Sequence, residues 1–272
     1  MNATIVEYDN IINNEIYEKD GARWWDVDNS FYTLRQSVNP VRVSYARKHL
    51  LAGNGSGPAG RKVLEVGCGG GLLTEEIAKM GFVTTGIDPA EASIRTAREH
   101  ALTNGLEIQY DRGSGEELPY PDNAFDAVFC CDVLEHVTDI NSVISEISRV
   151  LTPGGSFIFD TFNRTFISKV VVIKLWQDWK RWAFMEPNAH VWDMFIKPAE
   201  MKELLKRNDL EPSNISGTKP NIPLLTLLGN LRKRAAGEWT FRKFGDSFHL
   251  VEDTDVNIMY LGHAVKKIGL ET

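Results

Sequence analysis

A glycine-rich turn between Lys62 and Gly71, with the sequence KVLEVGCGGG, constrains this chain more than any other segment. The apolar residues Val63, Leu64 and Val66 predict a buried parallel strand, and a helix is expected to begin near Leu72. Because glycine has no Cβ atom, the backbone of such a turn lets a ligand lie directly against it. The sequence therefore predicts a ligand site where this strand meets its helix, with an empty strand-to-helix turn as the alternative.

An acidic residue, Asp88, ends the next predicted strand along the chain. A carboxylate at that position accepts hydrogen bonds from the ribose hydroxyls of a bound nucleoside. The dinucleotide fingerprint G-x-G-x-x-G, counted from Gly67 and Gly69, requires a third glycine where this chain has Leu72. Glu65 precedes the turn and suits a cationic amino-acid group. The pattern therefore favours S-adenosylmethionine (SAM) as the cofactor.

Composition excludes several classes of protein. The chain has 272 residues, 43% of them hydrophobic, which is enough to fill the core of one large α/β domain with a lid. Its net charge of −7 argues against general affinity for nucleic acid. The three cysteines, Cys68, Cys130 and Cys131, have no metal-type spacing, and the acidic N-terminal segment does not resemble a signal peptide. We therefore expect a cytoplasmic protein with reduced thiols.

Strands and helices alternate from residue 61 onward. Strands are predicted at 63–66, 83–87, 106–110, 123–131, 156–161, 210–217 and 256–265, and helices at 72–80, 90–103, 140–151 and 198–206. This order predicts a Rossmann-like, doubly wound, seven-stranded and mostly parallel sheet, with the last strand antiparallel at its edge. In such a sheet the ligand lies at the carboxyl ends of the strands.

Four regions follow from this reading: a helical N-terminal cap and linker (1–60), a SAM-binding core (61–161), a lid insertion interleaved with a helix and the sixth strand (162–250), and the final strand (251–272). In the cap, Ile11, Ile12 and Ile16 recur at helical spacing, residues 39–42 are expected to form a turn before a helix at 43–51, and residues 53–60 a flexible link. Trp24 and Trp25 are expected to pack the cap onto the core.

A cluster of candidate ligands follows the fourth strand. Asp132, Glu135 and His136 share one face if this segment forms a helical turn. They could hold a divalent cation such as Mg²⁺, or His136 could act as a general base oriented by a carboxylate. The alternative is that Glu135 and His136 satisfy the backbone of a tight loop at the end of the strand. His190, near the point where the lid returns to the sheet, is a second candidate base.

Two further residues are candidates for cofactor contacts. Ser114 follows the third strand and would face the adenine, unless it belongs to a surface turn. Arg42 is placed to reach an anionic ligand group, unless it is solvated.

Two surfaces are candidates for membrane contact. Residues 166–184 combine three tryptophans with interspersed lysines and an arginine, which suits a lid over an apolar substrate, a helix in a membrane interface, or a packed insertion. The basic residues between 232 and 243 either contact anionic lipid or are simply solvated.

Together these residues resemble the class I SAM-dependent methyltransferases, and more narrowly the O-methyltransferases of ubiquinone biosynthesis. The resemblance is carried by ARWWD (22–26), NPVR (39–42), EVGCGGGLL (65–73), GID (86–88), CDVLEHV (131–137), LTPGG (151–155), FIKPAEM (195–201) and DVNIMYLGHA (255–264). It implies cofactor contacts at Arg42, Gly67, Asp88 and Cys131. It also implies a divalent cation on Asp132, Glu135 and His136, where Asp132 replaces the usual glutamate.

The expected reaction is methyl transfer from SAM to a hydroxyl of a small aromatic, catechol-like or lipid-like acceptor, giving S-adenosylhomocysteine. Two alternatives remain open at this point: an N- or C-methyltransferase acting on another apolar metabolite, and a SAM-binding scaffold without turnover. The segment between residues 213 and 250 is longer than in the family, which leaves the acceptor open.

Overall fold

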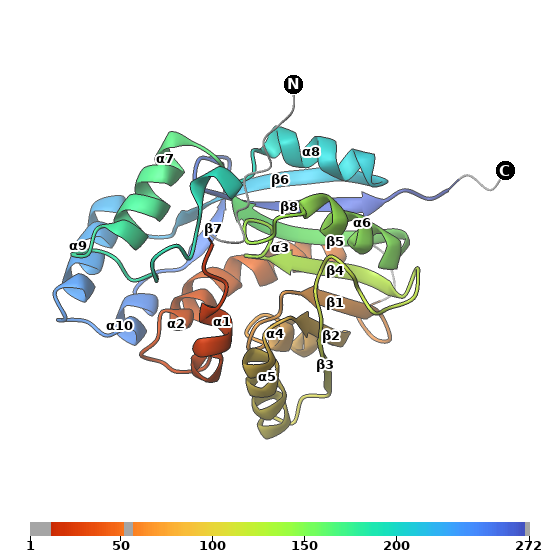
Figure 1. Cartoon of the computed structure of the whole chain (residues 1–272), viewed down its shortest axis with the longest axis horizontal. Helices are drawn as coiled ribbons and strands as arrows, with labels where there is room; N and C mark the ends of the chain where they lie inside the picture. Colours follow the sequence, from red (N-terminus) through yellow and green to blue (C-terminus); the bar gives the residue numbers. More distant parts are fainter. Residues whose placement is uncertain (1–11, 52–56, 270–272) are drawn as a thin grey trace.

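A computed structural model describes residues 12–51 and 57–269 (Figure 1). Ile11 and the first half of the expected linker therefore lie outside the described residues. The centre of the fold is an eight-stranded sheet of order β3-β2-β1-β4-β5-β8-β6-β7. Its strands are β1 (Lys62–Val66), β2 (Val83–Asp88), β3 (Ile108–Arg112), β4 (Phe125–Cys131), β5 (Leu151–Phe162), β6 (Leu210–Pro220), β7 (Leu250–Asp253) and β8 (Met259–Lys266). The predicted doubly wound α/β class is confirmed.

The first five strands run parallel, whereas β8 is antiparallel to both of its neighbours, β5 and β6. Two expectations about the far side of the sheet were wrong. The sheet has eight strands because Leu250–Asp253 adds β7, which pairs with β6 at the edge. The last strand is interior because β8 pairs with β5 on one side and β6 on the other, and its residues Met259–Ala264 are buried at every position.

Helices cover both faces of the sheet. Alternate residues of β1 and β4 point to opposite sides, so Leu64 and Val128 pack with α6 (Ile140–Val150) and α8 (Pro198–Arg207), while Val63 and Phe129 pack with α3 (Asn39–Leu50) and α4 (Thr74–Lys79). On the side of β2 and β3, α5 (Glu91–Thr103) completes the layer. The five parallel strands therefore form a rigid platform whose carboxyl ends meet at one edge.

The N-terminal cap consists of α1 (Ile16–Lys19), a 3₁₀ turn (Gly21–Arg23), α2 (Phe31–Thr33), a π-helical stretch (Leu34–Val38) and α3. The turn expected at residues 39–42 is wrong, because α3 begins at Asn39. Proline is accommodated in a first helical turn, where its missing N–H has no helical partner in any case, and Pro40 occupies that position.

The lid insertion contributes α7 (Phe166–Ser168), a π-helical stretch (Lys169–Asp178), a 3₁₀ turn (Trp192–Met194), α9 (Leu224–Ala235) and α10 (Phe241–Gly245). The cap and the lid meet where α2 packs on α10 (Figure 1), and Tyr32 Oη donates a 2.7 Å hydrogen bond to Asp246. In the described part of the chain, no helix has both the length and the apolar character needed to cross a membrane.

We predict that His263, an interior residue of β8, makes the fold sensitive to mild acid. Burial, together with the nearby His49, lowers the pKa of His263 to about 4, below the roughly 6.5 expected in the unfolded chain. Between these values the unfolded chain binds more protons, so the free energy of unfolding falls as the pH is lowered from 6.5 towards 4. His263→Gln should flatten this dependence in urea unfolding at several pH values. The exposed His249→Gln is the control, and an equal slope in wild type and His263→Gln would contradict the prediction.

Candidate active site

One cavity of about 920 Å³ lies at the carboxyl ends of the parallel strands. Its walls come from three regions: the glycine loop after β1 and the segments after β2, β3 and β4; the cap, from Asn14 to Arg42; and the lid, around residues 183–190 and α9–α10. This is the position at which open α/β sheets bind their ligands. All of the residues predicted as cofactor contacts line this cavity: Arg42, Glu65, Gly67, Gly69, Asp88, Ser114 and Cys131.

The glycine loop needs its glycines for two reasons. Gly67 and Gly69 have φ angles of 72° and 50°, in the left-handed region that favours glycine. A Cβ atom on Gly69 would also lie 2.5 Å from the indole ring of Trp24, and one on Gly67 would overlap Val133. The two glycines therefore let the loop pack directly against Trp24 of the cap and against Val133.

Asp88 connects the glycine loop to the end of β2. Its two carboxylate oxygens accept hydrogen bonds from the backbone N–H groups of Gly69 and Ala90, each at 2.9 Å. Each oxygen keeps a second lone pair, so the carboxylate can still accept hydrogen bonds from a ligand in the cavity. Burial raises the pKa of Asp88, and its two backbone bonds oppose that rise.

Glu65, the acidic residue before the loop, is 3% exposed and accepts a hydrogen bond from the Thr74 hydroxyl. Burial raises its pKa to about 8, because a carboxylate without a nearby unpaired cation is costly to bury. A cationic ligand group in the cavity would favour its charged form. Ser114 lines the cavity and directs its hydroxyl to Glu116, and Cys131 is buried at the end of β4.

Arg42 forms a buried network with two carboxylates. Its guanidinium donates to both oxygens of Asp160 at 2.6 and 3.0 Å, and Nη2 lies 2.5 Å from Asp132. Asp160 also accepts the backbone N–H of Asp132 at 2.9 Å. These contacts hold Asp132 with a φ of 53°, a left-handed conformation that costs roughly 1 kcal/mol in a residue with a Cβ atom. The alternative of a solvated Arg42 is wrong, because the side chain is 4% exposed.

The expected ligand cluster is only partly formed. Residues 132–136 form an irregular turn rather than a helix, and the Arg42 guanidinium, acting against burial, lowers the pKa of Asp132. The ligand atoms that lie within 4.8 Å of one another belong to Glu135, His136 and His190. The structure therefore joins the two candidate bases in one cluster and pairs Asp132 with Arg42 instead.

These three residues present buried polar atoms without hydrogen-bond partners: Glu135 Oε1, His136 Nδ1 and His190 Nδ1. Burial lowers the pKa of His136 to about 4 and that of His190 to about 3, so both rings are neutral near pH 7. Burial and the neighbouring Asp132 raise the pKa of Glu135. The lid fixes His190 through Gln177, which exchanges hydrogen bonds of 2.8 and 3.2 Å with its backbone.

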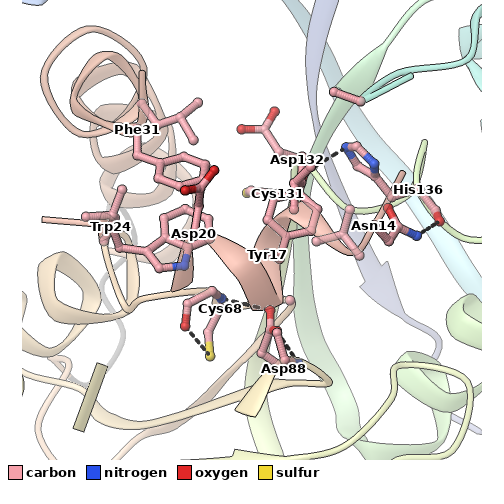
Figure 2. Close-up of a pocket in the computed structure, with 18 of the residues that line it drawn as sticks. Asn14, Tyr17, Asp20, Trp24, Phe31, Cys68, Asp88, Cys131, Asp132 and His136 are labelled. Carbon is pink, nitrogen blue, oxygen red and sulfur yellow. Dashed lines mark hydrogen bonds between the residues drawn. The ribbon is translucent and has the colours of Figure 1, made fainter. Parts of the chain in front are cut away.

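The cap contributes aromatic side chains that were not predicted as site residues. Figure 2 shows Tyr17 between Trp24 and His136. The Tyr17 ring is stacked on Trp24 at 6.0 Å and lies edge-on to His136 at 5.8 Å. Trp24 donates to Ser93 and Trp25 to the Gly70 carbonyl, both at 2.8 Å, so the expected packing of the cap on the core is confirmed.

Asp160 was also missed as a site residue. It stands in the apolar run FIFDTF, and an acidic residue inside a buried strand is the signal that could have identified it.

We predict that Gly69→Ala lowers affinity for S-adenosylhomocysteine by about tenfold or more. The added methyl group has to displace the Trp24 ring, and overpacking of this kind typically costs about 1–3 kcal/mol. Gly105→Ala is the matched control, because its φ is 66° but nothing lies within 4 Å of the added atom. Calorimetric titration of both variants tests this, and equal losses would mean that backbone strain alone is responsible.

The sequence and the fold were both compared with those of known proteins. Residues 64–159 match the methyltransferase domain family. A ubiquinone biosynthesis O-methyltransferase from Nitrosococcus oceani is 36% identical over 98% of this chain and 100% of its own length, and one from Hahella chejuensis is 34% identical over 93% of both chains. The magnesium protoporphyrin IX methyltransferase from Synechocystis, solved with bound S-adenosylhomocysteine, shares the fold with a TM-score of 0.61 at 17% identity, covering 95% of this chain and all of that one. The chain therefore belongs to the ubiquinone biosynthesis O-methyltransferase family of SAM-dependent methyltransferases.

Proposed function

We propose that this enzyme transfers the SAM methyl group to a hydroxyl of a catechol-like quinol, giving a methyl ether and S-adenosylhomocysteine. The observation that carries the proposal is one cavity lined both by the glycine loop with Asp88 and by His136 and His190, which cluster with the buried Glu135 behind the wall. The names of the relatives support a quinol of ubiquinone biosynthesis as the acceptor. A scaffold that only binds SAM would have no need for that second cluster.

The cofactor contacts follow from the chemistry of each group. Asp88 would accept hydrogen bonds from the ribose, Glu65 would face the ammonium group, and Arg42 the carboxylate. Gly67 and Gly69 would leave room for the methionine portion, Ser114 would border the adenine, and Cys131 would lie against the reactive end. These assignments are supported by the position of each residue on the wall of the cavity.

In the reaction the acceptor oxygen attacks the methyl carbon, the C–S bond breaks, and its electron pair stays on sulfur. The methyl donor is already activated, so alignment of the two reactants supplies much of the acceleration. The hydroxyl proton has to leave, and a phenol holds it near neutral pH. Burial makes His136 and His190 weak proton acceptors, because their pKa values fall to about 4 and about 3.

The unpartnered atoms of Glu135, His136 and His190 fit a divalent cation, since neutral imidazoles and a carboxylate are metal ligands. A cation there would stabilise the negative charge of the deprotonated acceptor oxygen. Two imidazoles with one carboxylate favour a transition metal over Mg²⁺, which prefers oxygen ligands. In this proposal His190, supplied by the lid, replaces Asp132 among the ligands.

We predict that chelator abolishes methyl transfer from labelled SAM to a catechol, and that Mn²⁺, Co²⁺ or Zn²⁺ restores it better than Mg²⁺. His136→Ala and His190→Ala should each lower turnover about a hundredfold while the affinity for S-adenosylhomocysteine is retained. His249→Ala, on the exposed surface, is the control. Chelator-resistant activity that still requires His136 would instead make that histidine the base. Activity independent of both would favour N- or C-methylation.

We also propose that the lid contacts anionic membrane surfaces. Five of the exposed large apolar side chains lie on or next to lid helices: Phe166, Ile167, Trp179, Leu224 and Leu225. Figure 1 places α7 and α9 at the same end of the molecule. The exposed basic residues Arg232, Lys233, Arg242 and Lys243 belong to α9 and α10 of the same insertion. Apolar side chains together with basic ones suit an interface with anionic headgroups.

We predict that more of the protein sediments with vesicles of mixed phosphatidylcholine and phosphatidylglycerol than with vesicles of phosphatidylcholine alone. The double substitution Phe166→Ser with Leu225→Ser should weaken this binding about tenfold, because both side chains would lose apolar burial in the interface. Leu102→Ser is a matched control, since Leu102 is 82% exposed on the distant helix α5. An equal effect of the control would rule out a lid-specific contact.

A further inference from the structure

Arg234 differs from the basic residues that surround it in the sequence. The sequence groups it with Arg232, Lys233, Arg242 and Lys243 as one basic surface, but the Arg234 side chain is half-buried and lines the cavity. Arg232 and Lys233 of α9 are exposed, and because successive residues of an α-helix point about 100° apart, Arg234 points in a different direction from both. Arg234 is therefore part of the cavity wall rather than of the basic surface.

The surroundings of Arg234 are aromatic and uncharged. Its guanidinium lies 4.0 Å from the ring centre of Phe241 and 5.9 Å from that of Phe184. Its Nη1 donates one hydrogen bond, 3.1 Å long, to the Ala183 carbonyl. A guanidinium has five N–H donors, so most of them remain available to a ligand. Burial lowers the pKa of Arg234, as expected for a cation that has lost water without gaining a carboxylate.

The charge of the cavity makes this arginine distinctive. Nine acidic residues line it: Glu15, Glu18, Asp20, Asp28, Glu65, Asp88, Glu116, Asp132 and Glu186. Three arginines do so. Arg42 is paired with Asp160 and Asp132, and Arg23 lies 3.6 Å from both Asp20 and Asp26. Among the described residues, Arg234 is the arginine of the cavity that makes no ion pair with a carboxylate.

We propose that Arg234 binds a carboxylate carried by the methyl acceptor, so that the enzyme acts on acidic catechols. The inference rests on the proposed function and narrows its substrate class. A planar guanidinium matches a carboxylate with two parallel hydrogen bonds, and Phe184 and Phe241 offer apolar surface for the attached ring. The contacts of Arg234 with Ala183, Phe184 and Phe241 place it on the lid, whereas Arg42 lies at the strand ends and is already paired with two carboxylates.

The test compares 3,4-dihydroxybenzoate with catechol, which differ by the carboxylate alone. Dissociation constants are measured by calorimetry on the full chain saturated with S-adenosylhomocysteine, and kcat/KM with SAM. Wild type should bind 3,4-dihydroxybenzoate at least about tenfold more tightly than catechol. Arg234→Met should weaken that binding roughly 10- to 100-fold and change catechol binding less than about twofold. Arg234→Lys, which keeps the charge but loses the two-pronged geometry, should fall between them.

Arg232→Met is the matched control, because it removes the same charge from the exposed side of the same helix. Arg234→Gln provides a second neutral variant that keeps a donor for Ala183, in case the methionine variant does not fold. An equal loss for both catechols, or an equal effect of Arg232→Met, would overturn the proposal. So would a loss confined to S-adenosylhomocysteine affinity, since that would assign Arg234 to the cofactor.

Two outcomes separate this inference from the proposed function. Arg234-dependent binding of 3,4-dihydroxybenzoate without methyl transfer to either catechol would support the carboxylate subsite and refute O-methylation of catechols. Methyl transfer to both catechols with no preference in binding would support O-methylation and refute the subsite.

Discussion

The buried ion-pair network of Arg42, Asp160 and Asp132 connects the cap to two of the strands that end at the site. Arg42 belongs to α3 of the cap, Asp160 lies near the end of β5, and Asp132 begins the loop after β4. Removing one member of such a network leaves a buried charge unpaired, which typically costs about 3–5 kcal/mol. The network therefore fixes the cap to the strand ends, and it holds the backbone of Asp132 in the conformation that orients the following turn, with Glu135 and His136.

The parallel half of the sheet could be predicted because its signals are local. Short apolar runs, glycine turns and helical periodicity recur in the order β-α-β from β1 to β5, and each signal lies within one segment of the chain. The far side depends on pairing between distant segments. No local pattern specifies that β8 inserts between β5 and β6, or that Leu250–Asp253 pairs with Gly217–Pro220. The strand predicted at 256–265 was expected at the edge, but its position depends on pairing with β5 and β6, which are distant in the sequence.

The residues of the candidate site also divide into those that local sequence patterns predict and those whose position depends on the fold. Gly67, Gly69 and Asp88 lie at fixed spacing on one β-α-β unit, so sequence alone places them together. Asp132 and His190 depend on the fold: the positive φ of Asp132 directs its carboxylate to Arg42, and the lid returns His190 to His136 from a position 54 residues away in the sequence. Arg234 could not be separated from its basic neighbours without the orientation of α9. The residues that sequence reasoning misplaced are therefore those whose partners lie on another element.

The excess of carboxylates around the cavity has a consequence for the two forms of the cofactor. SAM carries a sulfonium cation that S-adenosylhomocysteine lacks, so the field of a cavity in which acidic side chains outnumber arginines favours the reactant over the product. Methyl transfer removes the very charge on which that attraction acts. The same field opposes the formation of a phenolate, so a local positive charge beside the acceptor oxygen matters more here than it would in a neutral cavity. The same carboxylates that favour replacement of S-adenosylhomocysteine by SAM therefore increase the stabilisation that the phenolate needs from a nearby positive charge.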